Sequence, residues 1–478
     1  MQIGEKVVSG FRWLAAGKLA GQIVTWAVTI YVIRILTPED YGLMAMAMVV
    51  IGFLSLFDEL GMGAALIQQE TLDDRRVAQV FGLVIIINFS AFALLIAISP
   101  LIAGFFNEPR LIDITWVLAL QFPLLAAQII PDAMLRRRMQ FRKKSMVNFV
   151  AMIAGSFVTL GLAIAGHGVW ALILGSVVTV LIKTIGFIVV ARYFCLPSFN
   201  FTGLGRVVKF GTQVTSERVL WFIYSQADIF LVGRVLGKEM LGYYSVAMHL
   251  ASLPMTKLGA IVNEVSFAGF SRIQSEAKEV SRQFLKATKA ITVFAFPVFF
   301  GISSVAPEIV SSVLGDTWSL SAEPLQILSL VIPLRMLDLV IPTALLGTGR
   351  ADVGVINAAI AAVILPASFL TGLKWGLIGV CYAWLIGYSI YFIIALIRSL
   401  PRLGVGFWEY FVTIAGIAAS STIMLVVVHA TRTQLPVAWA GNLHQLAVLI
   451  AAGAATFGLL ALCFHRESLQ FVLRLVRQ

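Results

Sequence analysis

About fourteen apolar stretches of roughly 20 residues follow one another along almost the whole chain, with short connections between them. An α-helix of that length crosses about 30 Å of hydrocarbon. Because backbone groups in lipid must find hydrogen-bond partners within their own segment, each stretch is predicted to be a helix. The sequence therefore predicts an all-α polytopic membrane protein. The predicted spans are 11–33, 42–60, 77–104, 113–133, 146–166, 168–190, 208–233, 241–264, 290–306, 322–346, 353–371, 375–397, 408–430 and 443–464.

The composition supports the membrane class and argues against a separate soluble domain. Hydrophobic residues make up 59% of the chain and charged residues only 12%, against about 25% charged residues in soluble domains. Three widely spaced cysteines, Cys195, Cys381 and Cys463, indicate neither a disulfide framework nor a metal cluster. We expect no cofactor and no metal. The segment Met1–Lys6 runs directly into a long apolar stretch, so no removable signal peptide is expected.

The positions of Lys and Arg predict the orientation. Cytoplasmic connections of bacterial membrane proteins are enriched in Lys and Arg, which accounts for the net charge of +11 without nucleic acid. With the N-terminus in the cytoplasm, the cytoplasmic connections carry 23 basic residues and the opposite connections carry 6. Either twelve or fourteen spans then places both termini inside. We predict a multi-pass protein of the bacterial inner membrane with both termini cytoplasmic.

The longest connection, roughly 265–289, has an amphipathic pattern. Ile273, Ala277, Val280 and Phe284 occur at helical spacing, with polar residues between them. This pattern is typical of a helix that lies on the inner membrane surface. A short solvated helix between two spans is the alternative.

Two segments match at an offset of 200 residues. The segment 34–42 aligns with 234–242, and each follows one apolar stretch and precedes another. The identical pairs are Arg34/Arg234, Leu36/Leu236, Glu39/Glu239 and Gly42/Gly242. Six predicted helices separate the copies, so both halves enter the membrane in the same direction, as in known transporters with parallel repeats. We predict two six-helix lobes, 1–205 and 206–400, and two additional transmembrane helices with a short cytoplasmic tail in 401–478.

Polar residues form one stripe in each half. A charge at the centre of a membrane helix costs about 2.5–3.5 kcal/mol on insertion scales, so it usually faces protein or water. Lys18 and Arg218 occupy equivalent positions in the repeat. The stripes predict a hydrated, positively charged cavity, and the alternative is that the charges only satisfy neighbouring helices. The candidate substrate-binding residues are Lys18, Gln22, Thr25, Glu217, Arg218, Trp221 and Asp228.

Another intramembrane basic residue, Arg335, precedes Asp338 by three positions. Residues at that spacing are neighbours on a helix surface. We therefore predict an ion pair between Arg335 and Asp338 with a structural role.

Several segments resemble one family. The chain is similar to the polysaccharide transporter (Wzx-like) branch of the multidrug/oligosaccharidyl-lipid/polysaccharide exporter superfamily, over about residues 1–400. The similar segments are Leu36–Leu43, Phe57–Gln68, Gly166–Leu172, Ala227–Gly237, Gly242–Ala247 and Trp375–Val380.

The resemblance implies a transporter and not an enzyme. It implies two lobes around a central cavity, alternating access, and movement of polyprenyl-diphosphate-linked oligosaccharide to the outer leaflet for exopolysaccharide or lipopolysaccharide biosynthesis. The partners that it suggests are this lipid-linked substrate, membrane lipid, and the polysaccharide polymerase and export machinery. A cationic cavity suits a diphosphate, because basic groups replace its lost hydration.

Three alternatives remain from the sequence. A drug antiporter of the same superfamily should have a cavity dominated by carboxylates, whereas Lys18 and Arg218 offset Glu217 and Asp228 here. An integral-membrane glycosyltransferase or ligase needs a large extramembrane loop or an acidic catalytic cluster at the interface. A scaffold protein would not need the repeat or the intramembrane charges.

Overall fold

The computed structural model describes residues 22, 24–57, 73–202, 205–272, 276–436, 439, 441–466 and 470, without the side chains of 206–218, 256–269, 271–272 and 277. The regular structure of these residues is entirely helical, which confirms the predicted all-α class. The helices of the first part are Val24–Ile35, α2 (Pro38–Ser55), α4 (Asp74–Phe106), α5 (Leu111–Ala119), α6 (Gln121–Arg137), α7 (Phe141–Ile164), α8 (Val169–Ala191) and α9 (Gly205–Arg272). The helices of the second part are α10 (Ala277–Ser304), α11 (Ala306–Ile309), α12 (Ala322–Asp338), α13 (Val340–Gly347), α14 (Ala351–Gly372), α15 (Gly376–Ser399), α16 (Phe407–Gln434) and α17 (Leu443–Phe464).

Most of these helices suit a bilayer. Within the described residues, ten helices are long and apolar enough to cross a membrane, or up to eleven if the bent pair Val24–Ile35 and Pro38–Ser55 counts as one span. Two of the ten, Val219–Met255 and Ala351–Leu403, each overlap two predicted spans. The polytopic class is therefore confirmed, whereas the count of about fourteen stays a prediction.

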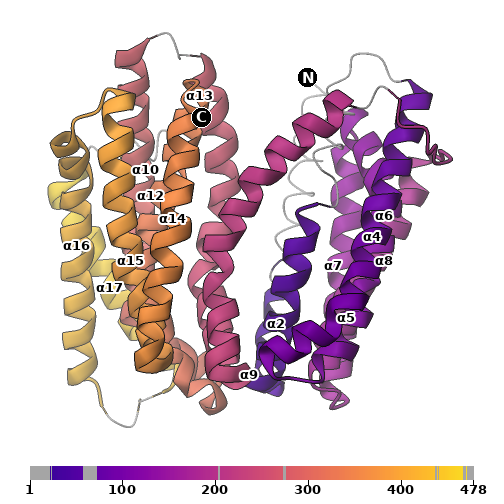
Figure 1. Ribbon diagram of the computed structural model, residues 1–478. Coiled ribbons are helices and arrows are strands. Elements are labelled where there is room, and N and C mark those ends of the chain that lie inside the picture. Colours follow the sequence, from indigo (N-terminus) through magenta and orange to yellow (C-terminus); the bar gives the residue numbers. More distant parts are fainter. Residues whose placement is uncertain are drawn as a thin grey trace, which may run out of the picture. The chain divides into compact units, whose positions relative to one another are not determined.

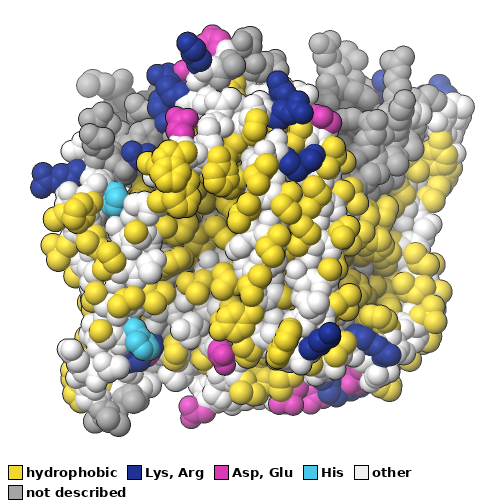
Figure 2. Space-filling view, turned by 60° about the vertical axis from the view of Figure 1, so that its left-hand side comes forward, with side chains coloured by type: hydrophobic (Ala, Val, Ile, Leu, Met, Phe, Trp, Pro, Cys, Tyr) yellow, Lys and Arg dark blue, Asp and Glu magenta, His cyan; other side chains and the backbone are white. Residues whose placement is uncertain are grey.

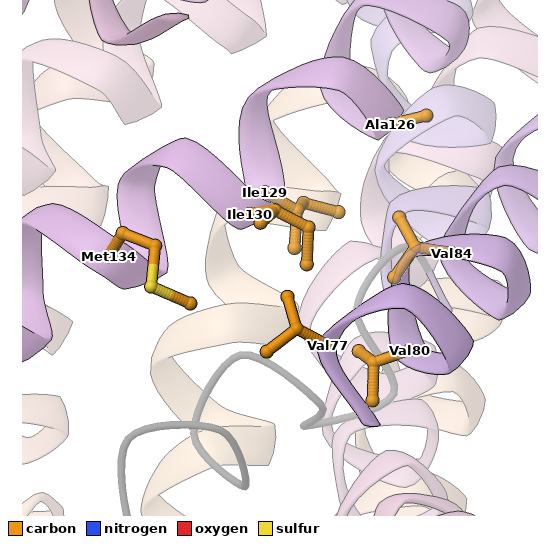
Figure 3. Packing of buried hydrophobic residues seen from close by; sticks show 7 residues of the cluster. All are labelled: Val77, Val80, Val84, Ala126, Ile129, Ile130 and Met134. Atoms are coloured by element: carbon orange, nitrogen blue, oxygen red, sulfur yellow. The ribbon is translucent and has the colours of Figure 1, made fainter. Parts of the chain in front are cut away.

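The chain divides into two compact units. Unit 1 comprises Met1–Phe222 and the short segment Gly237–Gly242, and unit 2 comprises Ile223–Leu236 and Tyr243–Gln478. In unit 1, α4, α6, α7 and α8 run side by side (Figure 1). A cluster of buried aliphatic residues holds α4 against α6, and Figure 3 shows these side chains converging between the two helices. The cluster consists of Val77, Val80, Val84, Ala126, Ile129, Ile130 and Met134.

Both copies of the sequence repeat interrupt a helix at the same position. In the first copy the chain bends by 116° between Ile35 and Pro38. After the bend, Thr37 and Asp40 form a capping box at the N-terminus of α2, and Pro38 is the first residue of that helix. In the second copy, α9 is interrupted at Gly237, whose φ of 81° is a conformation that glycine adopts readily. Thr37 and Gly237 are separated by the 200-residue offset of the repeat.

In unit 2, the long helices α10, α12, α14, α15, α16 and α17 form a bundle (Figure 1). Val305, Met424, Val428, Leu446 and Leu449 join α16 and α17 to the end of α10. On the face shown in Figure 2, charged side chains gather near the upper and lower rims, and hydrophobic side chains fill the band between them. This distribution is typical of a protein surrounded by lipid.

The amphipathic segment differs from the prediction. From Ala277 onward it is not a separate surface helix, because α10 continues without a break to Ser304. Val280 and Phe284 are buried, and the Phe284 ring stacks on Tyr410 of α16 with centroids 5.9 Å apart. The apolar face therefore packs on protein. Ile273 lies outside the described residues.

Candidate functional site

The predicted site residues of the first half lie partly outside the described structure. Lys18 is among the residues that are not described. Gln22 and Thr25 are half-buried. The backbone carbonyl of Thr25 accepts a hydrogen bond from the hydroxyl of Thr29 at 2.8 Å, so Thr29 is satisfied within its own helix.

The residues of the second half are all on α9 but in different surroundings. The backbone of Glu217 and Arg218 is helical, and their side chains are not described. Trp221 is half exposed, whereas Asp228 is buried. Trp221 belongs to unit 1 and Asp228 to unit 2. The binding role of the seven candidate residues therefore stays a prediction.

The carboxylate of Asp228 is engaged by neighbouring helices. Its Oδ2 accepts hydrogen bonds from the Tyr244 hydroxyl and from Nε1 of Trp384, the latter at 3.0 Å. Its Oδ1 accepts a hydrogen bond from the backbone N–H of Ile229 at 2.9 Å. A buried carboxylate needs such partners, because an unsatisfied one is very costly in a low-dielectric interior. Asp228 thus ties α9 to α15.

Arg335 and Asp338 do not form the predicted ion pair. The described residues contain no salt bridge between them, although both lie on α12. The Arg335 guanidinium lies over the Trp384 ring, 4.7 Å from its centroid, and Nη1 is 3.7 Å from Sδ of Met248. The partner of Arg335 is therefore an aromatic face, which attracts a cation through the ring quadrupole.

Asp338 is held by two tyrosines of α15. Its Oδ2 accepts hydrogen bonds from the Tyr388 hydroxyl at 2.9 Å and the Tyr391 hydroxyl at 3.3 Å. Its Oδ1 is buried and has no hydrogen-bond partner among the described residues. Both aspartates therefore accept hydrogen bonds from aromatic donors of α15, and Asp228 has a further aromatic donor, Tyr244, on α9.

Sequence reasoning missed these aromatic donors. Trp384, Tyr388 and Tyr391 follow one another at intervals of four and three residues, so they share one face of α15. A tryptophan or tyrosine inside the membrane carries a donor that needs a partner. This stripe of donors, together with the intramembrane carboxylates of Asp228 and Asp338, could have predicted the hydrogen bonds between them.

Unit 1 contains an ionic cluster of two carboxylates and two basic groups, Glu39, Glu108, Arg110 and Lys238. Lys238 Nζ lies 2.5 Å from Glu39 Oε1 and 2.7 Å from Glu108 Oε2. Arg110 Nε lies 2.9 Å from Glu108 Oε1, and Arg110 also pairs with Glu39. Each carboxylate therefore contacts both basic groups. The cluster joins the start of α2, the turn after α4, and the segment Gly237–Gly242.

The cluster shifts the ionisation of its members. The hydrogen bond from Arg110 is the largest cause that lowers the pKa of Glu108 to about 2, and Lys238 adds to it against the opposing effect of burial. Hydrogen bonds to Glu108 and Glu39 raise the pKa of Arg110. All of these shifts favour the charged forms.

The backbones beside this cluster cross at two glycines. A Cβ on Gly42 would lie 1.7 Å from the carbonyl oxygen of Lys238. A Cβ on Gly242 would lie 1.8 Å from the carbonyl oxygen of Pro38. The 200-residue offset relates the two contacts to each other, since Pro38 corresponds to Lys238 and Gly42 corresponds to Gly242. The repeat is thus a packing motif in which each copy supplies the glycine that the other requires.

Solved structures share this fold. The chain matches the lipid II flippase MurJ in an inward closed conformation with a TM-score of 0.77 and 16% identity, over 95% of this chain and 99% of that chain. It also matches an inward-facing multidrug resistance MATE family transporter of the MOP superfamily with a TM-score of 0.61 and 15% identity, over 80% of this chain and 94% of that chain.

Curated relatives are similar over most of their length. The teichuronic acid biosynthesis protein TuaB of Bacillus subtilis (strain 168) is 26% identical, over 73% of each chain. The lipopolysaccharide biosynthesis protein WzxC of Escherichia coli (strain K12) is 25% identical, over 87% of this chain and 85% of the relative. The succinoglycan biosynthesis transport protein ExoT of Rhizobium meliloti (strain 1021) is 27% identical, over 74% of this chain and 71% of the relative.

The family comparison agrees with these relatives. Residues 31–323, more than half of the chain, match the profile of one protein family, described as polysaccharide biosynthesis protein. The matched range includes both copies of the 34–42 and 234–242 repeat. The chain therefore belongs to the polysaccharide biosynthesis protein family.

Proposed function

We propose that this protein is a flippase of the bacterial inner membrane. It moves polyprenyl-diphosphate-linked oligosaccharide from the cytoplasmic to the outer leaflet by alternating access, for exopolysaccharide or lipopolysaccharide biosynthesis. It breaks no covalent bond and is a transporter, not an enzyme.

One observation carries the proposal: family membership over residues 31–323, together with relatives named for the biosynthesis or transport of cell-surface polymers. The fold supports a transporter, because the lipid II flippase matches almost the entire chain. The glycan classes in the relatives' names differ, so the shared element of substrate chemistry is expected to be the lipid-linked diphosphate.

The chemistry of the substrate explains why basic residues are needed inside the membrane. Transfer of an ionised diphosphate through bare hydrocarbon is prohibitive, because buried charges lose their hydration. Basic groups in a hydrated cavity replace that hydration while the prenyl tail stays in lipid. We assign this role to Lys18 and Arg218, and contacts with the headgroup to Gln22, Thr25, Glu217 and Trp221. Asp228 acts indirectly, through its hydrogen bonds to Tyr244 and Trp384, which position α9.

The proposed topology follows the sequence. We propose about fourteen transmembrane helices, with lobes at 1–205 and 206–400, two additional helices in 401–478, and both termini in the cytoplasm. The two long segments that each overlap two predicted spans support the higher number of helices. The polymerase and export machinery are proposed partners that act on the glycan after transfer.

A drug antiporter is the second candidate, and it is less well supported. The observation in its favour is the fold similarity to the MATE family transporter. That similarity has a lower TM-score than the one to the lipid II flippase and covers less of the chain. The family description concerns polysaccharides.

Deletion of the gene in its host tests the proposal. We expect surface polymer to be lost and the lipid-linked oligosaccharide to accumulate in a form protected from externally added reagents in spheroplasts. Expression of the wild-type protein should restore both. Normal polymer export combined with sensitivity to cationic drugs in the deletion strain would contradict the flippase function and favour the antiporter.

A further inference from the structure

A groove of about 740 Å³ opens in unit 2 where the start of α16, the end of α17 and Lys289 of α10 meet. A smaller hollow of about 370 Å³ continues from it along α10. Lys289, Glu409 and Thr413 line both. We call the two together the basic groove, since five Lys and Arg residues line it: Lys278, Arg282, Lys286, Lys289 and Arg466.

The basic residues of α10 form one continuous stripe. Lys278, Arg282, Lys286 and Lys289 are spaced by four, four and three residues, so they share one face along about 17 Å of helix. Arg282 pairs with Glu279 at 2.7 Å. Lys289 is half-buried, and no described side chain forms an ion pair with it. Among the described lining residues the one carboxylate is Glu409. The groove thus has an excess of positive charge that suits an anion.

The rim of the groove is aromatic and lies at the ends of two candidate spans. Trp408 is 72% exposed at the start of α16, and Phe464 is 74% exposed at the end of α17. The Trp408 ring stacks on Phe411 with centroids 5.6 Å apart. Tryptophan is enriched at the level of lipid headgroups. An exposed aromatic rim beside a row of ammonium groups therefore matches a molecule with both an anionic headgroup and acyl chains.

We propose that the basic groove binds the headgroup phosphate of an anionic phospholipid, with the acyl chains beside Trp408 and Phe464. A free phosphate would make no use of the aromatic rim. Apart from the Lys and Arg residues, the hydrogen-bonding side chains of the described lining are Ser281, Trp408, Glu409, Thr413, Cys463 and His465. Glu409 is the one acidic group among them, so the lining suits an anion better than an oligosaccharide. The groove shares no residue with the set that we assign to the substrate headgroup, and its test does not depend on transport.

Native mass spectrometry and thermal unfolding of the purified full-length protein test this site. The probes are phosphatidylglycerol, phosphatidylcholine and inorganic pyrophosphate. We expect phosphatidylglycerol to bind more tightly than phosphatidylcholine and to raise the unfolding temperature. The double variant Lys286→Gln/Lys289→Gln should weaken phosphatidylglycerol binding by roughly 30-fold, because each basic residue near an anionic lipid surface contributes about a factor of five. The control Arg142→Gln/Lys143→Gln removes two exposed basic residues at the start of α7 and should retain binding.

If the double variant folds poorly, a second variant still tests phospholipid binding in the basic groove. Glu409→Gln removes the carboxylate and should tighten phosphatidylglycerol binding about two- to fivefold. Equal losses in the groove variant and its control would show general surface attraction and overturn the proposal, as would unchanged binding in the groove variant and in Glu409→Gln. Pyrophosphate binding as tight as that of phosphatidylglycerol would assign the groove to a free anion instead.

Discussion

At the scale of single residues, two groups of charged side chains in the described part of the chain differ in their partners. Asp228, Asp338 and Arg335 contact aromatic side chains of α15, and Asp228 also accepts a hydrogen bond from Tyr244 of α9. Glu39, Glu108, Arg110 and Lys238 pair with one another. The aromatic partners satisfy the buried carboxylate of Asp228, and the ionic cluster satisfies the buried carboxylate of Glu108. Lys18 and Arg218 are the charges that we assign to the substrate.

Lys18→Gln and Arg218→Gln are expected to abolish or sharply reduce polymer export without lowering protein level or membrane insertion. The neutral side chain cannot replace the hydration of a diphosphate. The exchanges Lys18→Arg and Arg218→Lys keep the charge and should retain more activity, as measured by surface polymer and immunoblot. If both neutral variants export polymer at the wild-type rate, these residues do not hold the headgroup.

Glu108 should make stability depend on acidic pH. Its pKa in the folded protein is about 2, below the unfolded value near 4.5. The folded state therefore gains stability from the charged carboxylate above about pH 4.5, and this gain is lost as the pH falls from there toward 2. We expect the unfolding temperature of the wild type to fall over this range more steeply than that of Glu108→Gln. Parallel pH profiles would show that the cluster does not stabilise unit 1.

At the scale of elements, the reciprocal glycine contacts explain why the repeat segments match in sequence. Gly42 and Gly242 allow the start of α2 and the segment Gly237–Gly242 to approach until backbone atoms touch. The adjacent ionic cluster involves Lys238 and Glu39 from the same two segments. The crossing and the cluster therefore stabilise the same junction.

Alanine at either glycine of the crossing should be strongly destabilising. The new Cβ would lie within 2 Å of a carbonyl oxygen, and the backbone on both sides must move. We expect a loss of about 2 kcal/mol or more, or a large drop in folded protein. The control is Gly161→Ala on α7, where a Cβ meets nothing within 4 Å. Detergent-solubilised yield and unfolding temperature compare the three variants. Equal tolerance of all three would contradict the close crossing.

Hydropathy could predict the helices, because each apolar segment must satisfy its own backbone in lipid. It could not predict how helices continue or break. Gly237 interrupts α9 through its positive φ, and α10 extends past its apolar part because Val280 and Phe284 pack on protein. Hydropathy also could not predict contacts between residues far apart in the sequence, such as the hydrogen bond from Trp384 to Asp228, 156 positions away. For Arg335, the i,i+3 spacing on a helix predicted Asp338 as the partner, whereas the structure shows the Trp384 ring. The offset repeat was predictable, since both segments of the crossing carry arginine, leucine, glutamate and glycine at the same four positions.

At the scale of the whole molecule, the asymmetry of Lys and Arg predicts the orientation. Reporter fusions after Arg34, Arg142, Lys278 and Gln478 should report outside, inside, inside and inside, because basic connections stay in the cytoplasm. Paired alkaline phosphatase and fluorescent protein reporters distinguish the two sides. A periplasmic signal after Lys278 would contradict the proposed topology and, with it, the division into two lobes.

The central claim is that this protein moves a lipid-linked glycan across a bilayer. The most direct measurement uses proteoliposomes that contain the purified protein and a fluorescent polyprenyl-diphosphate oligosaccharide, with a membrane-impermeant quencher added outside. We predict that the label on the inner leaflet becomes accessible in vesicles with the wild-type protein. It should stay protected in protein-free vesicles and in vesicles with the Lys18→Gln/Arg218→Gln variant. An inner-leaflet label that stays protected in every preparation of folded wild-type protein would contradict the flippase function.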